Sequence, residues 1–126
     1  ILEHWDTIAA YTAETLSGED MVGGPTEADP SADTEANKAR VLEFTKQVRQ
    51  EGKTDRLSEI VAKDLVQHSA PIAGGIDGLA AWLGSEEAGS YEMLFPLLGQ
   101  GDFVITYGAP RARTAPCSTS SAWRAA

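Results

Sequence analysis

The chain has 126 residues, which is enough for one domain with a modest core and too few for two complete domains. Its apolar content of 42% and charged content of 23% are those of ordinary globular proteins and argue against wholesale disorder. The formal net charge of -9, from 10 basic and 19 acidic residues, opposes binding to nucleic acid or to an anionic membrane surface.

Other features of the composition concern redox state and location. Cys117 is the only cysteine, so it cannot form an internal disulfide, and a lone thiol is a weak candidate nucleophile. No stretch approaches the roughly 20 apolar residues that span a bilayer, and the beginning of the chain lacks the pattern of a signal peptide. We therefore expect a cytoplasmic protein. Because the chain begins at Ile1 rather than with methionine, we also expect a fragment or a processed chain.

The first 33 residues divide into a strand and a connector. Residues 1–8 are β-branched and aromatic, which predicts a strand with Leu2, His4, Asp6 and Ile8 on one face and Glu3, Trp5 and Thr7 on the other. Residues 9–33 show little periodicity and contain several glycines and prolines, so they are predicted to form a long connector.

Helical periodicity begins after the connector. Asp33 or Thr34 can cap a helix that runs from 34 to 51, whose apolar positions are Val41, Phe44 and Val48, and Gly52 is a suitable stop. Thr54 or Asp55 can cap a short second helix that contains Leu57, Ile60 and Val61. A third short helix is predicted over 76–83, between the glycines at 74–75 and Gly84.

The remaining elements are predicted strands. One strand is expected around 64–68, and the apolar runs 91–98 and 102–107 are expected to form a hairpin around Gly99-Gln100-Gly101. Pro96 removes one ladder hydrogen bond, which favours an edge strand or a bulge. Residues 108–126 show neither helical nor strand periodicity, so we expect no stable structure there.

Several motifs, taken in order, resemble the SnoaL-like (polyketide cyclase-like) family of the NTF2-like superfamily. They are Gln67-His68, the glycine turn, Ile76-Asp77-Gly78-Leu79 and Gly101-Asp102-Phe103-Val104, and they cover roughly 34–107. The resemblance implies an α+β fold, a cone formed by a curved, mostly antiparallel sheet with N-terminal helices around a small-molecule pocket. It also implies a homodimer.

The family closes its sheet with Glu-His-Trp-Asp, which stands here at the beginning of the chain, as Glu3-His4-Trp5-Asp6. Residues 1–8 are either the closing strand of a preceding tandem copy, which we favour, or part of a rearranged single domain. If the codons for Pro116 to Ala126 were read two bases out of frame, the genetic code would allow the peptide Val-Phe-Asp-Leu-Phe-Arg-Val-Glu-Gly-Gly. This peptide looks like the family's penultimate strand and turn. A frameshift after Tyr107, which would leave the domain incomplete at its C-terminus, is therefore a hypothesis.

His68 is the leading candidate catalytic residue, because the resemblance directs one face of its strand, shared with Val66 and Asp64, into the pocket. An imidazole there could transfer a proton next to a substrate carbonyl, and a structural core histidine is the alternative. His4 and Asp6 are further catalytic candidates, since the family's acidic residue performs the acid/base step of an aldol closure, but they can also be a solvent-facing pair. The candidate ligand-binding residues are Trp5, Val66, Trp82, Tyr91 and Phe95, although packing roles for the tryptophans and for Tyr91 are favoured over ligand stacking.

Phe95-Pro96 and Ser69-Ala70 depart from the family pattern, which weakens the case for catalysis. No His, Cys, Asp or Glu spacing is typical of a metal site, and no phosphate loop or nucleophile elbow is present, so we expect no metal and no cofactor. The predicted ligand is a small apolar or carbonyl-containing molecule. An aldol cyclase or isomerase is the first hypothesis, and a non-catalytic ligand-binding or dimerisation module or a truncated gene product are the alternatives.

Overall fold

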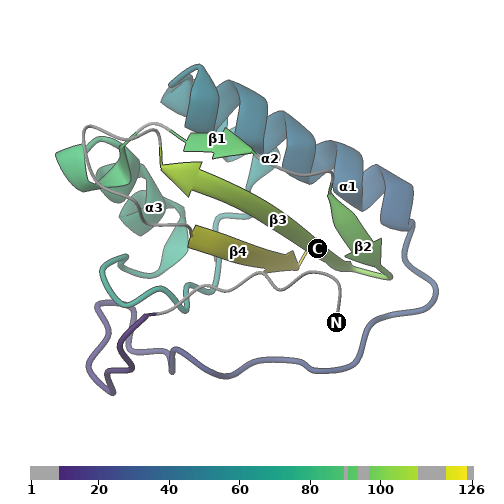
Figure 1. Cartoon of the computed structure of the whole chain (residues 1–126), viewed down its shortest axis with the longest axis horizontal. Coiled ribbons are helices and arrows are strands. Elements are labelled where there is room, and N and C mark those ends of the chain that lie inside the picture. Colours follow the sequence, from purple (N-terminus) through teal and green to yellow (C-terminus); the bar gives the residue numbers. More distant parts are fainter. Residues whose placement is uncertain (1–8, 90, 94–96, 111–118, 125–126) are drawn as a thin grey trace, which may run out of the picture.

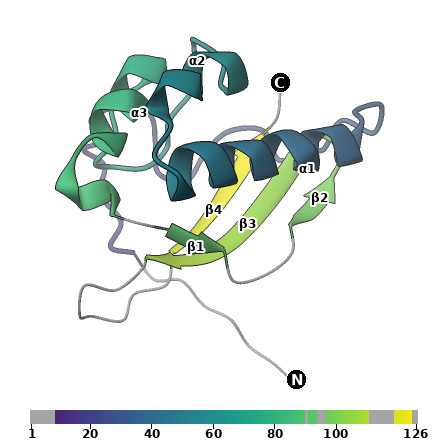
Figure 2. The same ribbon diagram turned by 90° about the horizontal axis from the view of Figure 1, so that it is seen from above.

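A computed structural model of the chain describes residues 9–89, 91–93, 97–110 and 119–124. The closing strand predicted over 1–8 lies outside the described residues, as does Pro96. Helices gather on one side of an antiparallel sheet, as Figures 1 and 2 show, so the fold is α+β.

The longest helical segment is formed by α1 (Thr34–Glu43) and η1 (Phe44–Gln50), which is π-helical. The Asp33 carboxylate accepts a hydrogen bond from the backbone N–H of Ala36 at 3.0 Å, which satisfies one free amide of the first turn. Val41, Phe44 and Val48 are buried, and Gly52 follows the helix with a φ of +71°. The helix predicted over 34–51 and its stop at Gly52 are confirmed.

The two shorter predicted helices are also confirmed. The second helix consists of η2 (Thr54–Arg56) and α2 (Leu57–Ile60), and the third is α3 (Gly75–Leu83), followed by the short η3 (Glu86–Ala88). Leu57 and Leu79 are 2% and 1% exposed, and they form the core cluster together with Phe44 and Val48 of η1. Burying the equivalent of one such leucine contributes about 1.5–3 kcal/mol, so this cluster is a main source of the helices' stability.

The sheet is built around β3 (Phe103–Pro110). β1 (Tyr91–Met93) and β2 (Leu98–Gln100) pair antiparallel with the two ends of β3, and β4 (Thr119–Arg124) pairs antiparallel with residues 103–108. Because β3 has only two edges, β1 and β2 share the edge opposite to β4. The predicted hairpin is confirmed, but its turn consists of Gly101 and Asp102, and Gly99 and Gln100 belong to β2.

The register between β1 and β2 changes. Met93 lies opposite Gly108 and Leu98 lies opposite Ile105, so four residues separate the first pair from the second along the chain, whereas two residues separate them along β3. The edge strand or bulge predicted from Pro96 lies outside the described residues.

Two predictions are wrong. Residues 64–68 form no strand, because their backbone bonds elsewhere: the Leu65 and Lys63 carbonyls accept the N–H groups of Gly75 and Ile76, at 2.9 and 3.2 Å. The expected lack of structure after Tyr107 is also wrong for the described residues, because β3 continues to Pro110 and β4 pairs along it. The polar sequence of β4 carries no strand period of its own, so its pairing depends on the ladder that β3 offers.

The two faces of β3 differ in burial. Val104 and Thr106 are 0% and 2% exposed and face the helices, whereas Ile105, between them, is 47% exposed. Gly99 of β2 lies on the helix side, where an added Cβ would come within 2.8 Å of the Thr34 methyl carbon. The glycine therefore allows α1 to approach the sheet closely.

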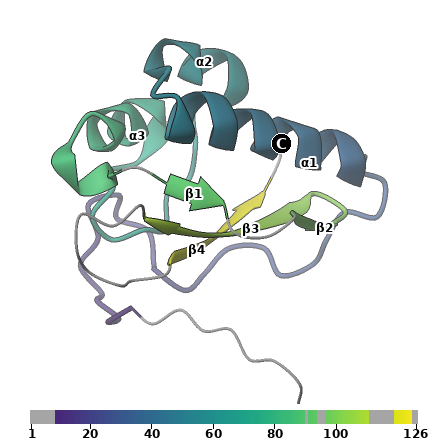
Figure 3. The same ribbon diagram turned by 45° about the horizontal axis from the view of Figure 1, so that its top comes forward.

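Residues 9–33 form no helix or strand, and we call this segment the strap. Figure 3 shows it passing along the β4 side of the sheet before it enters α1. At one end, Leu16 N donates to the Ala70 carbonyl (3.0 Å) and Ser17 Oγ donates to the Gln67 carbonyl (2.6 Å). At the other end, Asp29 N donates to Asp102 Oδ1 (2.8 Å). The connector predicted from composition is therefore tied to the domain at both ends.

Candidate functional site

His68 lies in the irregular segment between α2 and α3 and contacts the strap. Its Nδ1 atom is 2.6 Å from the carbonyl oxygen of Asp20. A carbonyl oxygen can only accept, so Nδ1 carries the proton, and Nε2 of the neutral ring is left as the acceptor. A Cβ on Gly24 would lie 3.5 Å from Nε2, so the absence of a side chain there leaves room beside this nitrogen. The ring is half-buried.

The side chains around His68 face differently from the prediction. Leu65 and Gln67 are half-buried, and Leu65 packs against the core cluster, whereas Asp64 and Val66 are exposed. Val66, which was predicted to line the pocket, is 58% exposed. The segment is not a strand of the sheet, so the alternation that would place Asp64, Val66 and His68 together on a pocket face does not apply.

Trp82 of α3 is half-buried and packs against the core cluster. The guanidinium carbon of Arg49 lies 4.8 Å from the centroid of its ring, which is a cation–π distance. Trp82 therefore has the packing role that the sequence analysis favoured over ligand stacking.

The other candidate site residues are placed in part or not at all. His4, Trp5, Asp6 and Phe95 lie outside the described residues. The backbone of Tyr91 is in β1, opposite Pro110, and its side chain is not described. Of the three catalytic candidates, the structure thus positions His68 alone.

The described surface includes two open hollows, and His68 lines neither of these two. The first, which we call the helix groove, runs along α1 and η1 to the following turn and is lined by Ala39, Leu42, Glu43, Lys46, Gln47, Glu51 and Lys53. The second, which we call the sheet hollow, lies between the strap and the hairpin and is lined by Thr26, Ala28, Leu98, Gly99, Gln100, Phe103 and Ile105.

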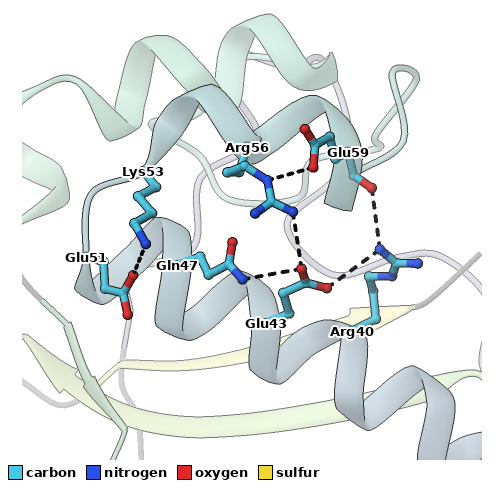
Figure 4. A network of polar contacts seen from close by, with 7 residues as sticks. All are labelled: Arg40, Glu43, Gln47, Glu51, Lys53, Arg56 and Glu59. Atoms are coloured by element: carbon cyan, nitrogen blue, oxygen red, sulfur yellow. Dashed lines mark hydrogen bonds and ion pairs between the residues drawn. The ribbon is translucent and has the colours of Figure 1, made fainter.

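A polar network borders the helix groove (Figure 4). Glu43 is its centre: it lies 3.7 Å from Arg40 and 3.6 Å from Arg56, and it accepts a hydrogen bond from Gln47 Nε2 at 3.4 Å. Arg56 also pairs with Glu59 at 2.6 Å, so the network joins α1 to η2 and α2. These side chains are partly exposed, and such pairs stabilise a fold by at most about 1 kcal/mol each.

Gln47 Oε1 is the one buried side-chain oxygen or nitrogen among the described residues that lacks a hydrogen-bond partner. Its amide nitrogen is engaged by Glu43, which fixes the orientation of the amide because a carboxylate must receive the N–H side. Because this buried oxygen has no hydrogen-bond partner, it slightly lowers the stability of the fold.

The β2–β3 turn is clamped by three donors that the sequence analysis did not identify. Thr34 Oγ1 and Asn37 Nδ2 of α1 donate to the Gly101 carbonyl, at 3.1 and 3.2 Å. Asp102 is 6% exposed and accepts the Asp29 N–H. The clamp fixes the end of the strap to the hairpin. The adjacent residues Gly101 and Asp102 were the only local sequence feature that pointed to this contact.

The sequence analysis also missed the residues of the sheet hollow. Leu98 and Ile105 are 68% and 47% exposed and lie opposite each other across the hairpin, on the face that points away from the helices. Both belong to apolar runs that were identified as strands. Only the register of the hairpin shows which of their residues face outward.

No three His, Cys, Asp or Glu side chains in the described ranges gather so that they could hold a metal ion. None of the helices in the described part of the chain has both the length and the apolar character that a membrane span requires.

Comparisons with family models, with curated proteins and with solved structures found no match to this chain. The likeness to the SnoaL-like family is therefore a resemblance carried by the motif residues of this sequence.

Proposed function

We propose that the chain is a SnoaL-like small-molecule pocket protein of NTF2-like architecture, in which His68 transfers a proton next to a substrate carbonyl. The reaction class is an aldol cyclisation or an isomerisation. Helices that cover one face of an antiparallel sheet support the architecture, and the family motifs around Gln67-His68 and Gly101-Asp102 support the choice of family.

One observation carries the catalytic part of the proposal. The hydrogen bond from Nδ1 to the Asp20 carbonyl fixes the tautomer in which Nε2 is the base. Catalytic imidazoles are usually oriented in this way, by an acceptor that binds the N–H of the nitrogen that does not react. Nε2 accepts a proton from the carbon next to a carbonyl, which leaves an enolate. The enolate carbon attacks a second carbonyl of the same molecule, and the resulting alkoxide takes the proton back from the ring.

Several sequence predictions belong to the same proposal. His4 and Asp6 would assist His68 if residues 1–8 reach its pocket, and Trp5, Tyr91 and Phe95 would line it. The ligand would be an apolar or carbonyl-containing molecule, and the protein a cytoplasmic homodimer. Size-exclusion chromatography with light scattering tests the dimer.

Replacement of His68 tests the catalytic role, and the choice of residue separates chemistry from structure. His68→Asn retains an N–H that can donate to the Asp20 carbonyl but has no base, whereas His68→Ala removes both. Because general acid–base catalysis contributes about 10²–10⁴-fold, both variants should lose at least 100-fold in rate. The assay is deuterium exchange next to the carbonyl of a small β-diketone, followed by NMR. Wild-type exchange rates in a folded His68→Asn variant would refute the role of His68.

A non-catalytic ligand-binding module is the second candidate. It is favoured by the bond of His68 to the strap, which can be purely structural. In that case, His68→Ala lowers stability and His68→Asn restores it, with no exchange activity in either variant or in the wild type.

A further inference from the structure

The charge of the chain is divided unevenly along its length. Residues 1–37 contain nine of the 19 acidic residues and none of the 10 basic residues, so residues 38–126 carry ten of each sign. The whole formal net charge of -9 therefore belongs to the first 37 residues. The strap, which makes up most of this stretch, is an anionic segment wrapped over an otherwise balanced domain.

The acidic side chains of the strap are exposed to solvent. None of the ion pairs between described residues involves Glu14, Glu19, Asp20, Glu27 or Asp33. Some of these carboxylates bond to nearby backbone amides, as Asp33 does to Ala36 N. Their negative charge is therefore available to a partner.

The strap forms one wall of the sheet hollow. Thr26 and Ala28 line the hollow, and Glu27, the residue between them in the sequence, is exposed. The opposite wall is apolar and consists mainly of Leu98, Phe103 and Ile105. Leu98 is 68% exposed, so its side chain is accessible to a partner.

Among the described side chains, one basic residue near this hollow is Lys38. Lys38 comes close to Gly99, but its ammonium group is paired with Glu35 at 3.0 Å. The strap beside the hollow contains acidic residues and no basic residue, so its formal charge is negative.

This combination of an apolar wall and an acidic strap restricts the partner. Nucleic acid and anionic lipid headgroups would be repelled. A second copy of the chain, docked symmetrically through the same hollow, would bring two anionic straps together, which also costs free energy.

We propose that the sheet hollow docks a basic, amphipathic peptide segment of a partner protein. Apolar side chains of the segment cover Leu98 and Ile105, and its Lys or Arg side chains lie against Glu27 and the strap. The apolar contact supplies most of the affinity, and the charges set the orientation and the rate of association. This proposal does not depend on catalysis by His68, which lines neither hollow.

The test uses the whole chain and a fluorescein-labelled peptide, Lys-Val-Lys-Leu-Lys-Val, in a fluorescence anisotropy titration. Leu98→Ser should weaken binding about tenfold, since the loss of about 1.4 kcal/mol of apolar burial corresponds to that factor. Glu27→Gln should weaken it about two- to fivefold, in keeping with an exposed charge pair. Raising the salt concentration from 50 to 500 mM should also weaken it, because the pair is screened.

Two matched variants serve as controls. Leu16→Ser changes an equally exposed leucine of the strap, and Glu19→Gln changes an exposed strap carboxylate, neither of which lines the hollow. Both should bind the peptide as the wild type does. Circular dichroism checks that all four variants are folded.

Three results would overturn the proposal. Equal losses in Leu98→Ser and Leu16→Ser would show that binding does not use the hollow. Equal binding of the peptide with glutamate in place of lysine would remove the charge argument. Concentration-dependent dimers of the wild type that Leu98→Ser abolishes would identify a second copy as the occupant.

Discussion

Replacement of Gly101 by alanine tests the clamp between the strap and the β2–β3 turn. Gly101 has a φ of +59°, in the left-handed region that favours glycine. A Cβ at this position would lie 2.4 Å from the carbonyl oxygen of Asp29 and 3.1 Å from the Ala28 Cβ. Because the nearest obstacle is backbone, no side-chain rotation can relieve the contact.

The magnitude follows from two contributions. An alanine in the left-handed conformation costs about 1–2 kcal/mol. The contact with Asp29 adds about 1–3 kcal/mol, the usual cost of overpacking a well-packed site. We therefore expect a loss of about 3 kcal/mol in the free energy of unfolding, which is a large part of the roughly 5–15 kcal/mol of a typical domain. At about 3–6 °C per kcal/mol for a chain of this length, Tm should fall by about 10–15 °C.

The assay is thermal unfolding followed by circular dichroism, and Gly52→Ala is the matched control. Gly52 also has a positive φ, +71°, but no heavy atom lies within 4 Å of an added Cβ. It should therefore lose only the conformational contribution of about 1–2 kcal/mol. Hydrogen exchange at the Asp29 amide, which donates to Asp102, should accelerate in Gly101→Ala only. Equal Tm values for the two variants and an unchanged Asp29 amide would refute the clamp.

Two further predictions concern the helices. Leu79→Ala should lower the free energy of unfolding, measured in urea, by about 2–5 kcal/mol, because this side chain is 1% exposed. Leu98→Ala, at 68% exposure, should change it by less than about 0.5 kcal/mol. Similar effects in the two variants would contradict the assigned core. Asp33→Ala should lower the free energy of unfolding by about 0.5–2 kcal/mol in the same measurement, because the Ala36 N–H loses its side-chain acceptor. Asp33→Asn should lower it little, because asparagine also caps helices. A full loss in Asp33→Asn would show that the carboxylate has a role other than capping.

The sequence predicted the helices well and the environment of the candidate site poorly. Helical periodicity and caps are local signals, so Val41, Phe44 and Val48 could be placed on one face of a helix that begins at Asp33. His68 could be singled out only through the family motif. Its actual contacts, with Asp20 and Gly24, come from a strap 44 to 48 residues away, and no local pattern encodes them.

The face of a strand was harder still to predict. Period-2 alternation states which residues share a face, but it applies only where a segment has a strand partner. Residues 64–68 have no such partner, and the alternation therefore does not decide where Val66, which is 58% exposed, points. For Leu98 and Ile105, the hairpin register and the position of the helices decide that they point away from the core.

The sequence by itself determined an α+β chain, the extent of its helices, the glycine turn of its hairpin and the acidic character of its first third. These depend on neighbours a few residues apart or on composition alone. The tertiary structure decided that the strap is tied to His68 and Asp102, that β4 pairs with β3, and that Leu98 and Ile105 form an exposed wall. Such contacts join segments far apart in the chain, where burial and hydrogen bonding, and not local preference, select the partner.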